Sequence, residues 1–201
     1  MKLKTTRLEA LTDGIFAIIM TVLLVGLSEV FSLNGPLTQS DLLKFFLALK
    51  NDFGIYILTF LILGVFWFEH HWQFHFIKHA DVALVFINIL WFMVICLLPF
   101  TSLLLGNHGH LFIPVFLFEL NILLSSLILY AHWLYASKHH RLLDPEVNKD
   151  IVSSHREAGL FLIGICVLAL IVTFWNSLIG LLVLAMSPLV FIFYRKSNHG
   201  S

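Results

Sequence analysis

Eleven histidines stand out in this chain of 201 residues, because imidazole can bind a metal ion, hold haem or carry protons. Four of them follow one another closely, at His70, His71, His75 and His79. Two pairs in this run, 71/75 and 75/79, have the i, i+4 spacing that can chelate a metal, but no acid or cysteine stands at a matching ligand spacing. Haem would need a facing histidine within another apolar segment, for which His132 is the one candidate. We therefore interpret the histidines as members of polar networks and predict no metal site, keeping a haem- or metal-binding membrane enzyme as an alternative.

A second group of reactive side chains flanks the first apolar segment, Arg7 to Glu29. Its uncharged part, Gly14 to Ser28, has 15 residues and would be about 22 Å long as a helix, shorter than the ~30 Å hydrocarbon core of a membrane. If this helix spans a membrane, Asp13 or Glu29 lies near membrane depth, against protein or water rather than lipid. A spanning helix whose ends prefer water is a candidate pore wall.

The helical period divides this segment into two faces. At 100° per residue, one stripe collects Gly14, Ile18, Val22, Val25 and Glu29, with Thr21 beside it. A polar or acidic end on an apolar stripe is typical of a surface that meets water. An ordinary packing face is the alternative.

Asp13 points away from this stripe, toward neighbouring helices. A carboxylate in such a place needs hydrogen bonds or a positive partner. The candidate partners are Arg7, His70, His71 and Asn88. Two further polar residues, Glu119 and Asn121, also fall inside an apolar segment, where interhelical hydrogen bonding competes with a functional role.

The composition indicates the class of fold that positions these residues. Apolar residues make up 59% of the chain and charged residues only 12%, about half the share of a soluble domain. The sequence therefore predicts an all-α integral membrane protein in a lipid bilayer. The net charge is zero, which gives no support for a nucleic-acid partner. Gly-rich phosphate loops, catalytic triads and cysteine clusters are missing, so we predict that it is not an enzyme, has no soluble small-molecule substrate and needs no cofactor.

Six membrane-spanning helices are expected in a single domain, 1–196, with residues 197–201 as a tail or expression remnant. The predicted helices are 8–30, 53–72, 82–105, 111–137, 158–175 and 178–194, and a short interfacial helix is predicted at 41–51. With the N-terminus inside, 10 of the 12 Lys and Arg residues fall on the inner side. The positive-inside rule therefore places both termini in the cytoplasm.

Three stretches of the sequence then resemble one known family. Arg7-x-x-x-Leu11-Thr12-Asp13 followed by a long apolar run is similar to the helix-1 signature Arg-x-x-x-Phe-Ser-Asp of the transmembrane protein 175 family of potassium channels. FLILGVFWFEHHWQF (60–74) resembles the second helix of that family, and INILWFMVICLLPFTSLLLG (87–106) resembles its third. Leu11 and Thr12 replace the Phe and Ser of the signature, which keeps the apolar bulk and the hydroxyl.

The resemblance implies a potassium-permeable channel that conducts passively, without a TVGYG-type filter and with modest selectivity over sodium. It implies a homotetramer in which helix 1 of each subunit lines a central pore, since one such helix cannot enclose a pore. By position relative to Asp13, the hydrophobic constriction falls on Ile18. Thr21 could offer hydroxyls to the permeating K⁺, Val22 and Val25 would continue the wall, and Glu29 would lie in the outer vestibule.

The same resemblance implies a structural network at the inner end of helix 1. Its expected members are Arg7, Thr12, Asp13, His70, His71 and Asn88. The single-repeat length resembles prokaryotic members, which implies the plasma (inner) membrane of a prokaryote. A proton-conducting or proton-activated channel is an alternative within transport, and a non-conducting scaffold is another.

Overall fold

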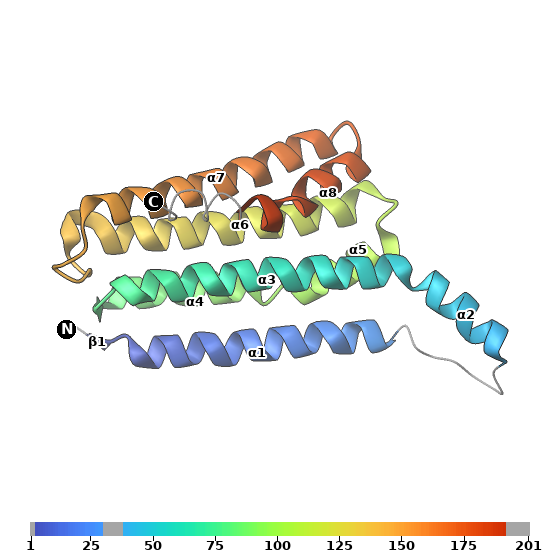
Figure 1. The fold of residues 1–201 in the computed structure, drawn as a ribbon, viewed down its shortest axis with the longest axis horizontal. Coiled ribbons are helices and arrows are strands. Elements are labelled where there is room, and N and C mark those ends of the chain that lie inside the picture. Colours follow the sequence, from blue (N-terminus) through green and yellow to red (C-terminus); the bar gives the residue numbers. More distant parts are fainter. Residues whose placement is uncertain (1–2, 30–37, 192–201) are drawn as a thin grey trace.

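The computed structural model describes residues 3–29 and 38–191, and within these ranges the side chains of 3, 27–29, 41, 44–46 and 48 are not described. Long helices run side by side in a bundle, with α1 along one edge, α3, α4 and α5 in the middle, and α6, α7 and α8 on the opposite side (Figure 1). The helices are α1 (Thr6–Glu29), α2 (Gln39–Ala48), α3 (Lys50–Phe76), α4 (Val82–Ile95), α5 (Leu98–His108), α6 (Phe112–Ser137), α7 (Lys149–Thr173) and α8 (Ser177–Ala185). The mainly helical architecture predicted from the sequence is confirmed.

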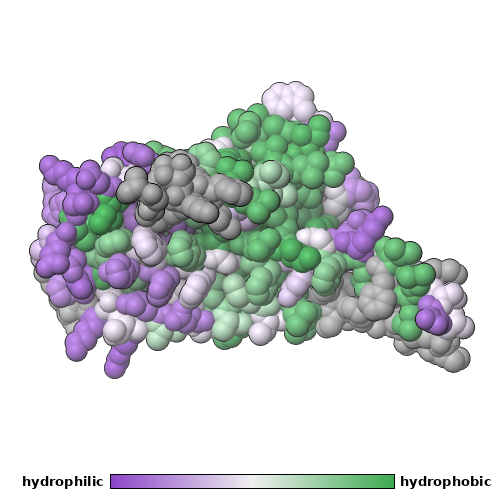
Figure 2. Space-filling view, in the orientation of Figure 1, coloured by the Kyte–Doolittle hydropathy of each residue, from purple (hydrophilic) through white to green (hydrophobic). Residues whose placement is uncertain are grey.

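Five helical segments within the described residues are long and apolar enough to cross a membrane. They are 6–26, 50–76, 82–108, 112–140 and 149–173, and a shorter apolar helix covers 177–191. Figure 2 shows hydrophilic residues gathered at the end of the bundle that carries the N-terminus, with a hydrophobic surface across the middle. An integral, multi-pass membrane protein therefore follows from the helices and from the surface.

The third predicted span is broken in the structure into α4 and α5. Pro99 explains the break, since proline has no N–H to donate and its ring clashes with the carbonyl of the residue four positions earlier. The helix ends at Ile95, and α5 restarts at Leu98 with Pro99 in its first turn. The two pieces together cover 82–108, slightly more than the predicted span.

α3 is longer than the predicted helix 53–72 at both ends. It follows α2 almost directly and continues through the polar run Glu69-His70-His71 to Phe76. Glu69, His70 and Gln73 are buried against other helices, so these polar residues belong to the interior of the bundle. α2, the predicted interfacial helix, projects from the far end of the bundle and exposes Leu43 and Leu47 (Figure 1).

The turn between α7 and α8 lies at the Asn176-Ser177 step, where the sequence predicts it. The Asn176 side chain caps α8 by accepting hydrogen bonds from the backbone N–H groups of Leu178 and Ile179, at 3.0 and 3.1 Å. The predicted end of the last helix at 194 and the tail at 197–201 lie outside the described residues.

Short loops close the bundle at the end that carries the N-terminus. The strand β1 (Leu3–Lys4) pairs with β2 (His79–Ala80), which ties the start of α1 to the α3–α4 connection. In the α6–α7 loop, Asp144 binds Lys78 at 2.9 Å. The hydrogen bond from Lys78 lowers the pKa of Asp144, and the same bond raises the pKa of Lys78.

Asp81 is a second anchor at this end. Its carboxylate caps α4 by accepting from the backbone N–H of Leu84 at 2.9 Å, and it also accepts from Tyr135 at 2.8 Å and from Arg141 at 3.0 Å. Burial raises the pKa of Asp81, but these hydrogen bonds and the Arg141 charge lower it by more, so the pKa lies below its ordinary value. The connections α3–α4 and α6–α7 are thereby joined.

Candidate ion pathway on α1

α1 is covered by the rest of the subunit on one face only. It packs mainly on α3 and α5, while α6 and α7 contact the other side of the bundle. The covered face consists of residues spaced three or four apart, namely Leu8, Thr12, Phe16, Ile19 and Leu23. The other face has no helix over it within the described part of the subunit.

The stripe predicted from the helical period lies on this uncovered face. Ile18 is 62% exposed, Val22 47% and Val25 57%. Gly14 continues the stripe and has open space where a side chain would stand. The structure thus presents Ile18, Val22 and Val25 together, away from the subunit's own core.

Thr21 lies beside Ile18 and Val22 and is also exposed. Its hydroxyl donates to the backbone carbonyl oxygens of Ala17 and Ile18, at 3.0 and 2.8 Å. Because a hydroxyl has one proton, this bond leaves the lone pairs of Thr21 Oγ1 as an acceptor on the uncovered face. Oxygen lone pairs are what a partly dehydrated cation needs.

An apolar groove of about 390 Å³ runs alongside the stripe, between α1 and the α4–α5 break. Its walls include Ile18, Val22 and Val25 on one side and Cys96, Pro99 and Phe100 on the other. The uncovered surface of α1 is therefore continuous with a hollow, and the two together form one apolar face of the subunit.

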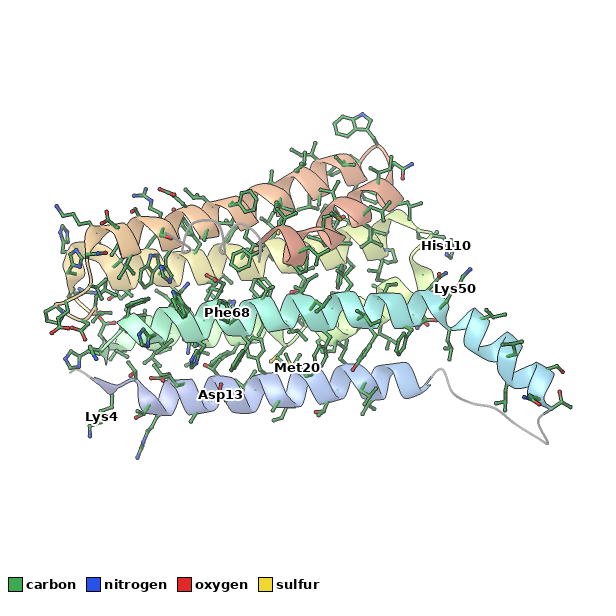
Figure 3. All side chains as sticks on the ribbon, viewed as in Figure 1. Lys4, Asp13, Met20, Lys50, Phe68 and His110 are labelled. Carbon is green, nitrogen blue, oxygen red and sulfur yellow. The ribbon has the colours of Figure 1, made fainter. Side chains whose placement is uncertain are left out.

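Asp13 meets a partner that was not predicted. Trp67 of α3 donates from Nε1 to the Asp13 carboxylate at 2.9 Å, and the Trp67 ring stacks on His71 with centroids 5.4 Å apart. Asp13 itself is exposed rather than buried. Figure 3 labels it on α1, on the N-terminal half of the helix. The signal that could have identified Trp67 is the helical period, which puts it one turn before His71 on the same face.

His70 and Asn88 form a separate buried pair. His70 Nε2 and Asn88 Oδ1 are 2.9 Å apart, and both residues are almost completely buried. The His70 ring stacks on Trp91 of α4, with centroids 4.8 Å apart and planes only 1° from parallel. The pair joins α3 to α4, directly behind α1.

The remaining predicted members of the inner network lie apart from these pairs. Thr12 is buried, and its hydroxyl donates to the carbonyl of Leu8 within α1. Arg7 is exposed. The side chain of Glu29, the predicted vestibule residue, lies outside the described residues. The structure therefore groups Asp13 with His71 through Trp67, and His70 with Asn88.

Two polar contacts deeper in the bundle were not predicted as pairs. Thr173 of α7 donates to the Glu119 carboxylate of α6 at 2.9 Å. His132 Nδ1 lies 2.8 Å from Gln73 Oε1, which joins α6 to α3. Each contact links residues more than 50 positions apart, so no local spacing could reveal it. Among the described residues there is no group of three or more His, Cys, Asp or Glu side chains placed to hold a metal ion.

Comparison with known proteins shows which protein family this sequence resembles. The sequence model of the family described as the endosomal/lysosomal potassium channel TMEM175 matches residues 7–99, which include α1, α3 and α4. A potassium channel of Streptomyces collinus is 29% identical over 156 residues, covering 75% of this chain and 73% of that protein. The endosomal/lysosomal proton channel TMEM175 of Danio rerio is 27% identical over 143 residues, and the match covers 70% of this chain but only 26% of that longer protein.

The fold has a solved counterpart as well. The crystal structure of a lysosomal potassium-selective channel TMEM175 homolog from Chamaesiphon minutus aligns with a TM-score of 0.77, covering 97% of this chain and 98% of the other. At 20% identity this likeness concerns the fold alone. The sequence comparisons therefore make this chain similar to the TMEM175 family over residues 7–99, and to the S. collinus potassium channel over three quarters of its length.

Proposed function

We propose that this chain forms a homotetrameric potassium channel in which α1 of each subunit lines a central pore. The observation that carries the proposal is the uncovered apolar stripe of α1, formed by Ile18, Val22 and Val25. The bacterial relative from S. collinus is named a potassium channel, which supports the same reading. One such helix cannot enclose a pore, so several copies must meet about an axis, and closed rotational symmetry provides this arrangement.

Ile18 is the proposed constriction. It is the most exposed of the three stripe residues, and a ring of branched aliphatic side chains gives an ion nothing to replace its hydration shell. A narrow ring of this kind dewets and stops ions, whereas a wider ring passes a hydrated or partly stripped ion. The constriction therefore acts as a gate more than as a filter.

Selectivity in this proposal is modest. Potassium gives up its hydration water more readily than sodium, and the lone pairs of Thr21 Oγ1 lie one turn beyond the constriction, where they could replace part of that water. Val22 and Val25 continue the wall. A conventional TVGYG-type filter is missing from the sequence, so steep discrimination between the two ions is not expected.

The proposal includes a topology. The apolar helix 177–191 would complete a sixth span after the five longer ones, with both termini in the cytoplasm of a prokaryotic cell. The end of the bundle that carries β1, β2 and the ion pairs of Asp81 and Asp144 would then be cytoplasmic. The Trp67–Asp13 bond would fix α1 near this inner end, behind which His70 and Asn88 hold α3 to α4.

Ile18→Asn tests the assignment. In liposomes that contain the purified protein, the substitution should raise the potassium flux and lower the preference for potassium when sodium competes, because an amide ring stays wet. Leu24→Asn is the matched control, since Leu24 is 54% exposed but lies about 120° from Ile18 around the helix. A potassium flux that is unchanged in Ile18→Asn would contradict the gate, and no flux in the wild-type protein would contradict the channel.

Proton conduction is the second candidate, because the animal relatives are named proton channels. The reversal potential under opposed potassium and proton gradients separates the two ions. A reversal potential that follows the potassium gradient supports the first proposal, and one that follows the proton gradient supports the second.

A further inference from the structure

A small pocket lies behind α1 at the end of the bundle opposite β1. It has a volume of about 30 Å³, enough for one water molecule or a single ion, and it lies between α1, α3 and α5, with a mainly apolar lining and one open side. Leu23 and Gly26 of α1 form one wall, and Asp52, Tyr56 and Ser102 supply its oxygen atoms. Lys50, labelled in Figure 3, marks this end of α3.

Asp52 brings a negative charge to the pocket without a cation to match it. Both ion pairs in the described part of the chain, those of Lys78 and Arg141, lie at the opposite end of the bundle. Asp52 also accepts no hydrogen bond from any described residue. The amino end of α3 favours a carboxylate there, but that end supplies only part of a charge.

The Asp52 carboxylate is directed at Gly106, in the last turn of α5. A methyl group at Gly106 would stand 2.7 Å from Asp52 Oδ1, so the absence of a side chain is what lets the carboxylate approach. The carboxyl end of a helix carries the negative end of its dipole. A carboxylate held beside such an end repels it unless a positive charge lies between them, and helix carboxyl ends coordinate cations in transport proteins.

The buried hydroxyl of the pocket, that of Ser102, is oriented as an acceptor by Thr59. Thr59 donates its one proton to the carbonyl of Ile55 at 2.8 Å, so in the 2.9 Å contact between Thr59 and Ser102 the donor is Ser102. Ser102 is only 4% exposed, and its Oγ lone pairs remain for whatever occupies the pocket. A carboxylate and an acceptor hydroxyl suit a cation and exclude an anion.

We propose that this pocket is a binding site for a monovalent cation, potassium in the first instance, which it supplies to the adjacent pore. Hard oxygen ligands favour alkali and alkaline-earth ions over zinc or copper. A calcium site takes six to eight oxygen ligands, commonly with several carboxylates, so a site with a single carboxylate fits a monovalent ion better. The supply role rests on the proposed channel function, and Gly26 of α1 borders both this pocket and the apolar groove beside the stripe.

Thallium(I), a potassium substitute with strong anomalous scattering, tests the site directly. Crystals of the full chain soaked in a thallium salt should show an anomalous peak between Asp52 and Ser102. The peak should be lost in Asp52→Asn and in Gly106→Ala, because the first variant removes the charge and the second displaces the carboxylate. It should persist in Gly54→Ala, the matched control, since a methyl group at Gly54 meets nothing within 4 Å. A missing peak in the wild-type protein, or a peak that survives both Asp52→Asn and Gly106→Ala, would overturn the site.

Single-channel conductance tests the supply role. The first measurement uses about 10 mM potassium on the α2 side, because at this ionic strength electrostatic interactions extend over roughly 30 Å. Asp52→Asn should then lower the current that enters from that side about two-fold. At about 1 M salt, where the range falls to roughly 3 Å, the difference should vanish. Gly106→Ala keeps the Asp52 charge but displaces the carboxylate from the pocket, so this variant should lower the current as Asp52→Asn does. If Asp52 acts only as a surface charge, the Gly106→Ala current will equal that of the wild-type protein, and this result would overturn the proposal. A wild-type protein without potassium current would refute the channel function, while the thallium peak would still decide the site.

Discussion

α7 and α8 pack closely against each other at Gly180, and replacing this glycine by alanine should lower the stability of the protein markedly. A methyl group at Gly180 would stand 1.8 Å from Thr173 Oγ1, and 2.9 Å from both the Ala169 carbonyl oxygen and the Thr173 backbone nitrogen. Two of these three atoms are backbone and cannot turn aside. The third belongs to the hydroxyl that donates to the buried Glu119 carboxylate at 2.9 Å.

The size of the effect follows from these contacts. Forcing a methyl group into a packed helix contact costs about 1–3 kcal/mol. Turning the Thr173 hydroxyl away leaves both Glu119 oxygens without a partner among the described residues, since Oε2 already has none, and an orphaned buried group costs about 1–3 kcal/mol more. Alanine favours the helix by about 1 kcal/mol relative to glycine, which offsets part of this loss. The net loss is about 3 kcal/mol.

Thermal unfolding of the detergent-solubilised protein measures this loss, with size-exclusion chromatography to follow its assembly. Gly180→Ala should melt well below the wild-type protein. Thr173→Ala placed in the same chain should recover part of the loss, because it removes the atom nearest to the new methyl group, and the two changes should therefore be non-additive. Gly164→Ala on α7 is the control, since nothing lies within 4 Å of its added methyl group. If Gly180→Ala melts like Gly164→Ala, the packing argument is wrong.

Two further predictions concern α1 and the ion pairs at the opposite end of the bundle. Trp67→Phe removes the hydrogen bond to Asp13 and should lower stability by about 2 kcal/mol in a thermal melt, whereas Trp175→Phe, at an 80% exposed position, should change it little. Asp81 has a pKa below its ordinary 3.8 in the folded protein, so its contribution to stability is complete above pH 3.8 and is lost as the pH falls through the folded-state pKa. Melting temperatures measured from pH 7 to pH 3 should therefore fall less steeply at the acid end in Asp81→Asn, and an identical acid limb would contradict the hydrogen-bonding assignment.

Periodic features of this chain could be predicted from the sequence. The faces of α1 follow directly from the 3.6-residue repeat, which puts Ile18, Val22 and Val25 together whatever surrounds them. The Asn176-Ser177 turn could also be predicted, because an uncharged stretch that is too long for one membrane span must be divided, and Asn is a good helix cap. Pro99 carried the signal for the α4–α5 break, although the sequence alone led us to expect one continuous helix.

Contacts between distant segments could not be predicted in the same way. The sequence predicted that the helix containing Glu69, His70 and His71 ends at residue 72, but α3 continues to Phe76 because side chains of other helices meet His70 and Gln73. His70 meets Asn88, and Gln73 meets His132, across separations of 18 and 59 residues. Polar residues inside a membrane bundle look from the sequence alone like residues at its surface, since only the packing decides which of the two they are.

The distribution of polar contacts bears on which helix can move. α3, α4 and α6 are joined by buried side-chain pairs, and α6 is joined to α7 by Thr173 and Glu119. In the described part of the chain, the side-chain hydrogen bond between α1 and the other helices is that of Trp67 with Asp13, and the rest of its covered face is mainly apolar. Apolar contacts are non-directional, so α1 could tilt or rotate about Asp13 without leaving polar groups unpaired. Ile18 lies five residues beyond Asp13, about 7.5 Å along the helix, where such a tilt would change the width of the proposed constriction.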